Sequence, residues 1–163
     1  MPDLRVLIGQ DAAPFFDDLA RLRIDVFRAF PYLYDGDIDY ERRYLATYAR
    51  APESLFVLAF DGERVVGAST GIPLEQETKA VREPWSAAGI DPADVFYFGE
   101  SVLLPEYRGL GLGHRFFDER EAYARKLERF ERTSFCAVER EADHPRRPAD
   151  YRTLHSFWRA RGY

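Results

Sequence analysis

Three glycines within five residues, placed directly after an apolar stretch, constrain this chain more than any other feature of its sequence. The segment Leu103–Glu119 reads LLPEYRGLGLGHRFFDE, and a helical pattern begins as soon as the glycines end. Gly109, Gly111 and Gly113 are costly at a helix start if helix stability is the only requirement. They predict a turn in which the backbone must lie close to a ligand.

The first turn of a helix is an anion site, because its N–H groups have no partner in the helix and the helix dipole is positive there. Arg108 adds a permanent cation with forked donors. A Walker loop would need Lys and Ser or Thr after the last glycine, but His114 and Arg115 stand there. A dinucleotide fingerprint needs a different glycine spacing. We therefore expect some other phosphorylated ligand, with a ligand-free glycine turn as the alternative.

The remaining chain alternates between strand-like and helix-like patterns, which predicts an α/β or α+β fold. Asp61 and Gly62 predict a tight turn within a hairpin, and we expect Asp11 and Asp150 to cap the first and last helices. No repeat or linker divides the chain, so we expect one domain over residues 1–163. The predicted strands are 3–9, the hairpin 54–72, 94–104 and 133–139, and the predicted helices are 11–30, 39–50, part of 74–90, 111–129 and about 150–161.

Composition excludes several classes of protein. A formal net charge of −5 argues against a nucleic-acid partner, for which a basic patch is expected. Cys136 is the single cysteine, so neither a disulfide framework nor a thiolate metal cluster is expected, and its apolar neighbours predict a buried thiol. No apolar run has the length of a membrane span and no signal peptide is recognisable, so we expect a cytoplasmic protein without a metal.

The stretch SVLLPEYRGLGLGHRFFDE closely resembles the acetyl-CoA-binding signature of the GNAT N-acetyltransferase superfamily, with Arg108, Gly111 and Gly113 at signature positions. The late segment HSFWRARGY and the hairpin 54–72 are also similar to that family's late helix and its second and third strands. The resemblance implies a twisted mixed sheet, flanked by helices, whose central parallel strands splay apart. It also implies acetyl-CoA as co-substrate and direct acetyl transfer to a primary amine.

The resemblance also implies where acetyl-CoA binds. Its diphosphate would lie on the glycine loop, and its pantetheine arm would run along the preceding strand like an added β-strand. A β-bulge there would aim a backbone N–H at the thioester carbonyl. The implied contact residues are Val102, Leu103, Leu104, Arg108, Gly109, Leu110, Gly111, Leu112, Gly113 and His114.

Three residues are candidates for removing the proton of the amine. Glu139 ends the predicted strand 133–139 and shares a face with Ala137, where some relatives carry a catalytic glutamate. Glu100 has apolar neighbours, and desolvation would raise its pKa. Tyr97 stands where other members place a glutamate, and it faces away from Glu100 unless a bulge intervenes. For both glutamates, an ordinary surface or salt-bridged carboxylate is the alternative.

The proton donor for the leaving thiolate is where this sequence departs from the family. Trp158 stands where many relatives have a tyrosine, and an indole N–H is not a proton donor of that kind. His155, Tyr151 or water are candidate substitutes. The departure keeps a second function open, that of a catalytically impaired acyl-CoA-binding sensor or interaction module.

The acceptor site is predicted near Tyr32 and Tyr34, where aromatic rings and nearby acids would hold a cationic amine. A small-molecule amine is favoured, and a protein amino group stays open. The family's final strands usually begin near Tyr163, so we expect them to be missing or short. An open sheet edge there would favour a homodimer.

Overall fold

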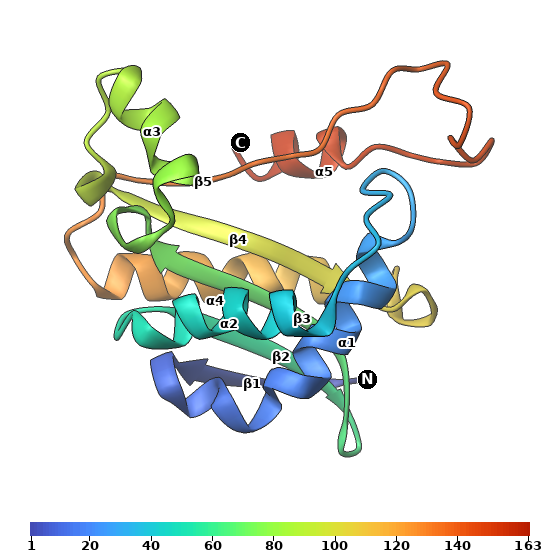
Figure 1. The fold of residues 1–163 in the computed structure, drawn as a ribbon, viewed down its shortest axis with the longest axis horizontal. Coiled ribbons are helices and arrows are strands. Elements are labelled where there is room, and N and C mark those ends of the chain that lie inside the picture. Colours follow the sequence, from blue (N-terminus) through green and yellow to red (C-terminus); the bar gives the residue numbers. More distant parts are fainter.

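A computed structural model describes all residues from Met1 to Tyr163. Its five strands form one mixed sheet in the order β1-β2-β3-β4-β5, in which only the last pair is parallel (Figure 1). This sheet confirms the predicted fold class. The strands are β1 (Asp3–Ile8), β2 (Leu55–Asp61), β3 (Arg64–Pro73), β4 (Val95–Leu103) and β5 (Arg132–Phe135).

Helices cover both faces of this sheet, with α1 and α2 on one face and α4 on the other (Figure 1). The α-helices are α1 (Phe16–Phe27), α2 (Ile38–Arg50), α3 (Lys79–Ala87), α4 (Leu112–Lys126) and α5 (His155–Ala160). Four short 3₁₀ helices connect elements: η1 (Gly9–Phe15), η2 (Leu74–Gln76), η3 (Pro92–Asp94) and η4 (Pro105–Tyr107). No helix is both long and apolar enough to cross a membrane.

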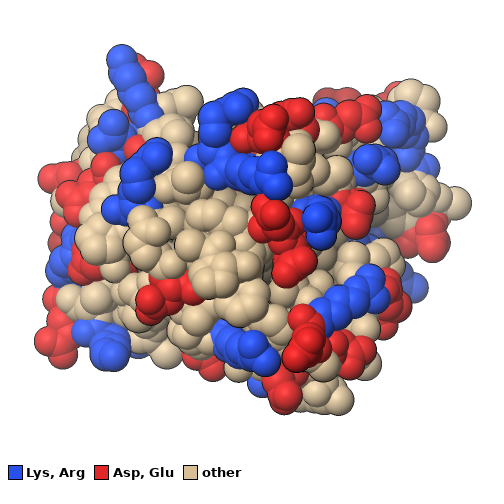
Figure 2. All heavy atoms as spheres, turned by 60° about the horizontal axis from the view of Figure 1, so that its bottom comes forward, with Lys and Arg blue, Asp and Glu red and all other residues tan.

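The sheet is buried on both faces, which explains why β2 is an unbroken apolar run. Phe56 and Leu58 belong to the apolar cluster under α1 and α2, whereas Leu55 and Val57 belong to the cluster against α4. Alternate residues of one strand therefore serve two separate cores. On the face that Figure 2 shows, acidic and basic side chains are interspersed rather than gathered by sign.

Two irregularities of β4 create the space for a site. Pairing with β5 ends where Phe98 lies opposite Phe135, so the rest of β4 has no strand on that side. Against β3, Phe98 pairs with Gly71 and Ser101 with Ser69, which leaves one extra residue in β4. The predicted splay is confirmed. A bulge is present in β4 as well, but at Gly99 and Glu100, next to the point of splay, rather than at residues 102–104 where the resemblance implied it.

Several predicted boundaries were wrong. The first helix starts at Phe16 because Gly9–Phe15 forms a 3₁₀ helix, and Asp11 lies inside it instead of capping α1. The last strand ends at Phe135, since β4 diverges from it, and Cys136 beyond that end is exposed rather than buried. The last helix begins only at His155, so Asp150 does not cap it; prolines and tight turns occupy the segment before it.

Candidate active site

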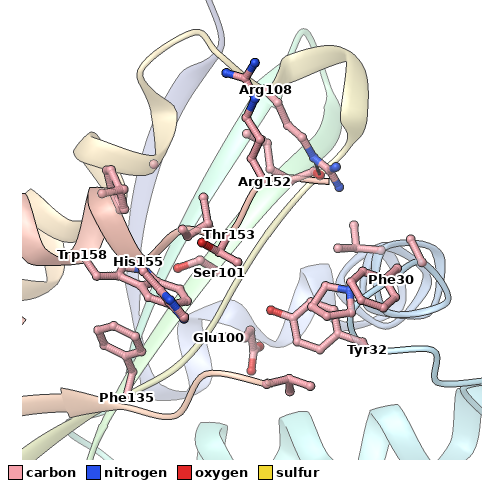
Figure 3. Close-up of a pocket in the computed structure, with 18 of the residues that line it drawn as sticks. Phe30, Tyr32, Glu100, Ser101, Arg108, Phe135, Arg152, Thr153, His155 and Trp158 are labelled. Atoms are coloured by element: carbon pink, nitrogen blue, oxygen red, sulfur yellow. Dashed lines mark hydrogen bonds between the residues drawn. The ribbon is translucent and has the colours of Figure 1, made fainter. Parts of the chain in front are cut away.

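A cavity of about 1130 Å³ opens where β4 and β5 separate. Its walls come from the glycine loop, the unpaired half of β4, the end of α1 with the loop after it, α4, and the segment between β5 and the end of α5. Figure 3 shows Arg108 and Arg152 at one end of this cavity and Phe135 at the other. The cavity therefore joins the phosphate-type loop to the point of splay.

The glycine loop has the backbone of an anion site. Gly109 and Gly111 have φ of 77° and 79°, a left-handed conformation that strains any other residue, and a Cβ at either would meet no atom within 4 Å. None of the six N–H groups from Gly109 to His114 donates to a backbone carbonyl. Gly111 also stands at the N-cap of α4, so the helix dipole adds to these donors. This cradle fits a diphosphate.

Only part of the predicted cofactor set lines the cavity. The residues that do are Leu103, Arg108, Gly109, Gly111, Gly113 and His114. Val102 and Leu112 are each 1% exposed and pack in the two cores, while Leu104 and Leu110 lie outside the lining. The Arg108 guanidinium donates through Nε to the Leu103 carbonyl at 3.3 Å.

Glu100 lies in a buried polar cluster on the α1–α2 face. Its Oε2 is 2.6 Å from an Arg23 guanidinium nitrogen, and the Tyr44 hydroxyl donates to the same oxygen at 3.3 Å. Arg23 also forms an ion pair with the fully buried Glu41. Burial alone would lower the pKa of Arg23, but the charge of Glu100, helped by Tyr44 and Glu41, outweighs burial and raises that pKa. The guanidinium stays charged and fixes the orientation of Glu100.

The bulge decides how the two β4 candidates face. Tyr97 belongs to the apolar cluster under α1 and α2, and Glu100 contacts the same two helices, so both side chains lie on one face. Burial, followed by a hydrogen bond with Cys136, raises the pKa of Tyr97, which keeps its hydroxyl protonated. The bulge needs glycine at Gly99, because a Cβ there would lie 2.7 Å from Thr70 Oγ1 and closer still to the Tyr48 hydroxyl.

Glu139 has different surroundings. Its side chain is 78% exposed, lies beyond the end of β5, and has Oε1 3.6 Å from His155 Nε2. The predicted strand alternation with Ala137 therefore does not apply, although Glu139 still lines the cavity. Trp158 packs against Phe135 with ring centroids 5.1 Å apart, and His155 lies beside it at 5.6 Å.

Of the two tyrosines predicted for the acceptor site, only one lines the cavity. Tyr32 lines the cavity, with its ring 4.6 Å from Phe27 (Figure 3). Tyr34 packs near Tyr40 and lies outside the lining. Phe30, beside Tyr32 in Figure 3, forms an edge-to-face pair with Tyr151 at 4.6 Å, and all three residues line the cavity.

Sequence reasoning missed two buried arginines, Arg23 and Arg120. Each carries a usable signal, because each stands four residues after an apolar residue of its helix's buried face: Leu19 before Arg23, and Phe116 before Arg120. A cation within an apolar stripe is rarely left without a function or a partner.

The model of the acetyltransferase (GNAT) family matches residues 17–149. No curated protein sequence matches the chain.

Solved structures share its fold at low sequence identity. The aminoglycoside acetyltransferase AAC(6')-Iy, determined with the bisubstrate analogue CoA-S-monomethyl-acetylneamine, gives a TM-score of 0.65 at 12% identity, covering 100% of this chain and 90% of that one. A possible acetyltransferase from Clostridium difficile 630 gives 0.66 at 10% identity, with coverage of 98% and 90%. The aminoglycoside acetyltransferase meta-AAC0020 from an uncultured soil sample, in complex with trehalose, gives 0.59 at 17% identity, with coverage of 99% and 88%.

Proposed function

Because this chain belongs to the acetyltransferase (GNAT) family, we propose that it transfers the acetyl group of acetyl-CoA to a primary amine of a small molecule. The observation that carries the proposal is the run of N–H groups without backbone acceptors from Gly109 to His114, which opens onto the unpaired half of β4. The loop holds the diphosphate, and the open strand edge accepts the pantetheine arm. Bound acetyl-CoA supplies the activated acetyl group.

Glu100 is the base in this proposal. Glu100 faces the cavity from the bulge, and Figure 3 shows Tyr32 near it on the loop after α1. Arg23 and Tyr44 hold the Glu100 carboxylate in place. A carboxylate so placed takes the proton of an approaching amine, directly or through one water. Glu139 remains the second candidate base, with His155 as its neighbour.

The acceptor is proposed to be a small amine that enters beside Tyr32 and Phe30. Two of the structural neighbours are aminoglycoside acetyltransferases, which supports a polar, amine-bearing small molecule as the substrate class. The concave cavity and its aromatic residues favour such a molecule over a protein amino group. The single domain over residues 1–163, the homodimer and the cytoplasmic location stay predictions.

Two measurements test the function. Release of the CoA thiol from acetyl-CoA in the presence of a panel of small amines should be amine-dependent. Arg108→Glu should weaken CoA binding by about tenfold or more, since a charge-assisted bond becomes a repulsion. Arg21→Glu on the exposed side of α1 is the charge-matched control and should bind CoA as the wild type does.

The outcomes separate the two functions. Binding of CoA without thiol release for any amine would favour the non-catalytic acyl-CoA-binding module, for which Trp158 in the acid position is the supporting observation. Unchanged CoA affinity in Arg108→Glu would contradict both.

A further inference from the structure

Arg120 is the most deeply buried cation of the molecule and has an incomplete set of partners. It lies in the middle of α4 and is 1% exposed. Its Nε donates to the Phe116 carbonyl at 3.2 Å, and one terminal nitrogen donates to the Glu100 carbonyl at 3.3 Å. The other terminal nitrogen is buried and has no hydrogen-bond partner.

No carboxylate pairs with this guanidinium. It lies over two aromatic rings, 4.3 Å from the centroid of Phe98 and 4.6 Å from that of Phe117. Burial lowers the pKa of Arg120 to about 9; the charges of Tyr163, Glu100 and Glu121 oppose this only in part, and that of Arg161 adds to it. The side chain is therefore a buried cation without a counter-ion at neutral pH. Such a charge is energetically unfavourable until an anion binds to it.

Its position is at the floor of the cavity, where the strands part. Arg120 lines the cavity, and Glu100, whose carbonyl it bonds, lies two residues after the last β4 residue paired with β5. Arg120 lies nine positions after Gly111, the N-cap of α4, which corresponds to about 13 Å along a helix. On the other wall, the three residues back from Leu103 to Glu100 cover about 10 Å of strand.

A ligand that is held at the glycine loop and extends about 10 Å along β4 therefore reaches the Glu100 carbonyl, where Arg120 binds. This step rests on the proposed function: an arm that starts at the loop and follows β4 ends near the Glu100 carbonyl. The end of a pantetheine arm is its sulfur. The missing partner of the buried guanidinium is then a group that becomes negative during the reaction.

We propose that Arg120 holds the thiolate of coenzyme A as the acetyl group leaves it. The amine nitrogen forms a bond to the acetyl carbon, the carbon–sulfur bond breaks with its electron pair going to sulfur, and the amine proton goes to the base. The thiolate then forms an ion pair with Arg120 and takes a proton from water on release. A tyrosine at position 158 is not needed for this step.

The test measures binding rather than turnover. Affinities of CoA and desulfo-CoA are measured by calorimetry from about pH 6 to about pH 9, where a thiol of ordinary pKa near 8.5 titrates. Arg120 should lower the pKa of the bound thiol, so the preference for CoA over desulfo-CoA should rise with pH, by about tenfold for each unit of lowering. We expect a rise of about tenfold in the wild type.

Variants assign the effect to one side chain. Arg120→Met should abolish the rise, and Arg120→Lys, which keeps the charge, should keep part of it. Arg161→Met is the matched control, because Arg161 also lies over Phe117, at 5.1 Å, yet is paired with Asp118 and Glu121 and does not line the cavity. It should keep the full rise.

Each failure has its own meaning. If the wild type binds neither CoA nor desulfo-CoA, the proposed function fails. If both bind and their ratio does not change with pH, the function stands and the role of Arg120 is refuted. The wild-type result alone decides this, even if Arg120→Met does not fold. An equal loss in Arg161→Met would also refute the role, since it would be a general effect of positive charge.

Discussion

Two buried arginines lie on opposite faces of β4, and both bond to the same residue. Arg23 on α1 binds the carboxylate of Glu100, and Arg120 on α4 binds its backbone carbonyl. Around Arg23 two carboxylates compensate one cation, and its pKa is raised against the effect of burial. Arg120 forms no ion pair with a carboxylate, and burial lowers its pKa more than the charges of Glu100 and Glu121 raise it.

The difference shows how one strand supports two kinds of site. Arg23, which is paired with Glu41 and Glu100, is held in place and orients the Glu100 carboxylate. Arg120, which has no ion pair, is energetically unfavourable in the ligand-free protein and can bind a negative charge on a ligand. Variants that remove either cation or the residue between them should separate these two roles.

The largest effect is expected from Glu100→Gln. It removes the carboxylate that pairs with Arg23 but keeps the carbonyl that holds Arg120. Loss of a general base should lower kcat/KM by about 10²–10⁴-fold. CoA affinity should be nearly unchanged, because the backbone contact and the glycine loop remain. Steady-state kinetics with calorimetry measures both.

Glu139→Gln is the matched control for this prediction. Its carboxylate is exposed and lies on the other wall of the cavity. A small effect is expected. If this variant instead lost most of the activity and Glu100→Gln did not, the base would be Glu139.

Arg23→Met should have the next largest effect, this time on stability. It leaves Glu41 and Glu100 buried without their cation, which should lower the free energy of unfolding by about 3–5 kcal/mol. Denaturant unfolding measures it. Arg21→Met, two residues earlier on the same helix, removes an exposed pair at 4.0 Å and should cost less than about 1 kcal/mol.

A second substitution sharpens the same prediction. In Arg23→Met combined with Glu41→Gln, one of the two stranded charges is gone, so part of the lost stability should return. Strictly additive losses would show that the two side chains do not act as a pair.

The smallest effect is expected from Arg120→Met at neutral pH. The variant loses two hydrogen bonds but also a buried charge without a counter-ion, so the net change should stay within about 1 kcal/mol. A loss as large as that of Arg23→Met would mean that Arg120 is compensated in the ligand-free protein.

The pH dependence of this difference has a definite sign. Because the pKa of Arg120 is lower in the folded state, to about 9, the unfolded state binds the proton more tightly. The cost of the charge is full below about pH 9 and falls as pH rises above it. Between about pH 8 and about pH 10 the wild type should therefore gain about 1 kcal/mol relative to Arg120→Met.

Much of the fold was predictable because its signals are local. The turn at Gly62, the apolar run of β2 and the helical stripe of α4 each follow from a few neighbouring residues. The end of β5 was not predictable in this way. Its sequence continues as an apolar run past Phe135, but the strand stops because β4 diverges, and this divergence is a property of the sheet.

The same difference between local signals and long-range contacts applies to the site. The glycine loop is a local motif, and its free N–H groups follow from glycine and from a helix start. The surroundings of Glu100 depend on α1, α2 and a bulge, which no local pattern reports. The predicted burial of Glu100 is confirmed. The position of Arg23 within the apolar stripe of α1 marks it as buried, but no local pattern predicts that Glu100 is its partner.

The unpaired half of β4 has a last consequence. An open strand edge usually recruits another chain and leads to aggregation. Here the segment that returns toward α5 forms the opposite wall, so the edge faces a cleft instead of open solvent. A single flexible arm can pair with such an edge, whereas a strand of a folded neighbour would first have to displace the segment on the opposite wall.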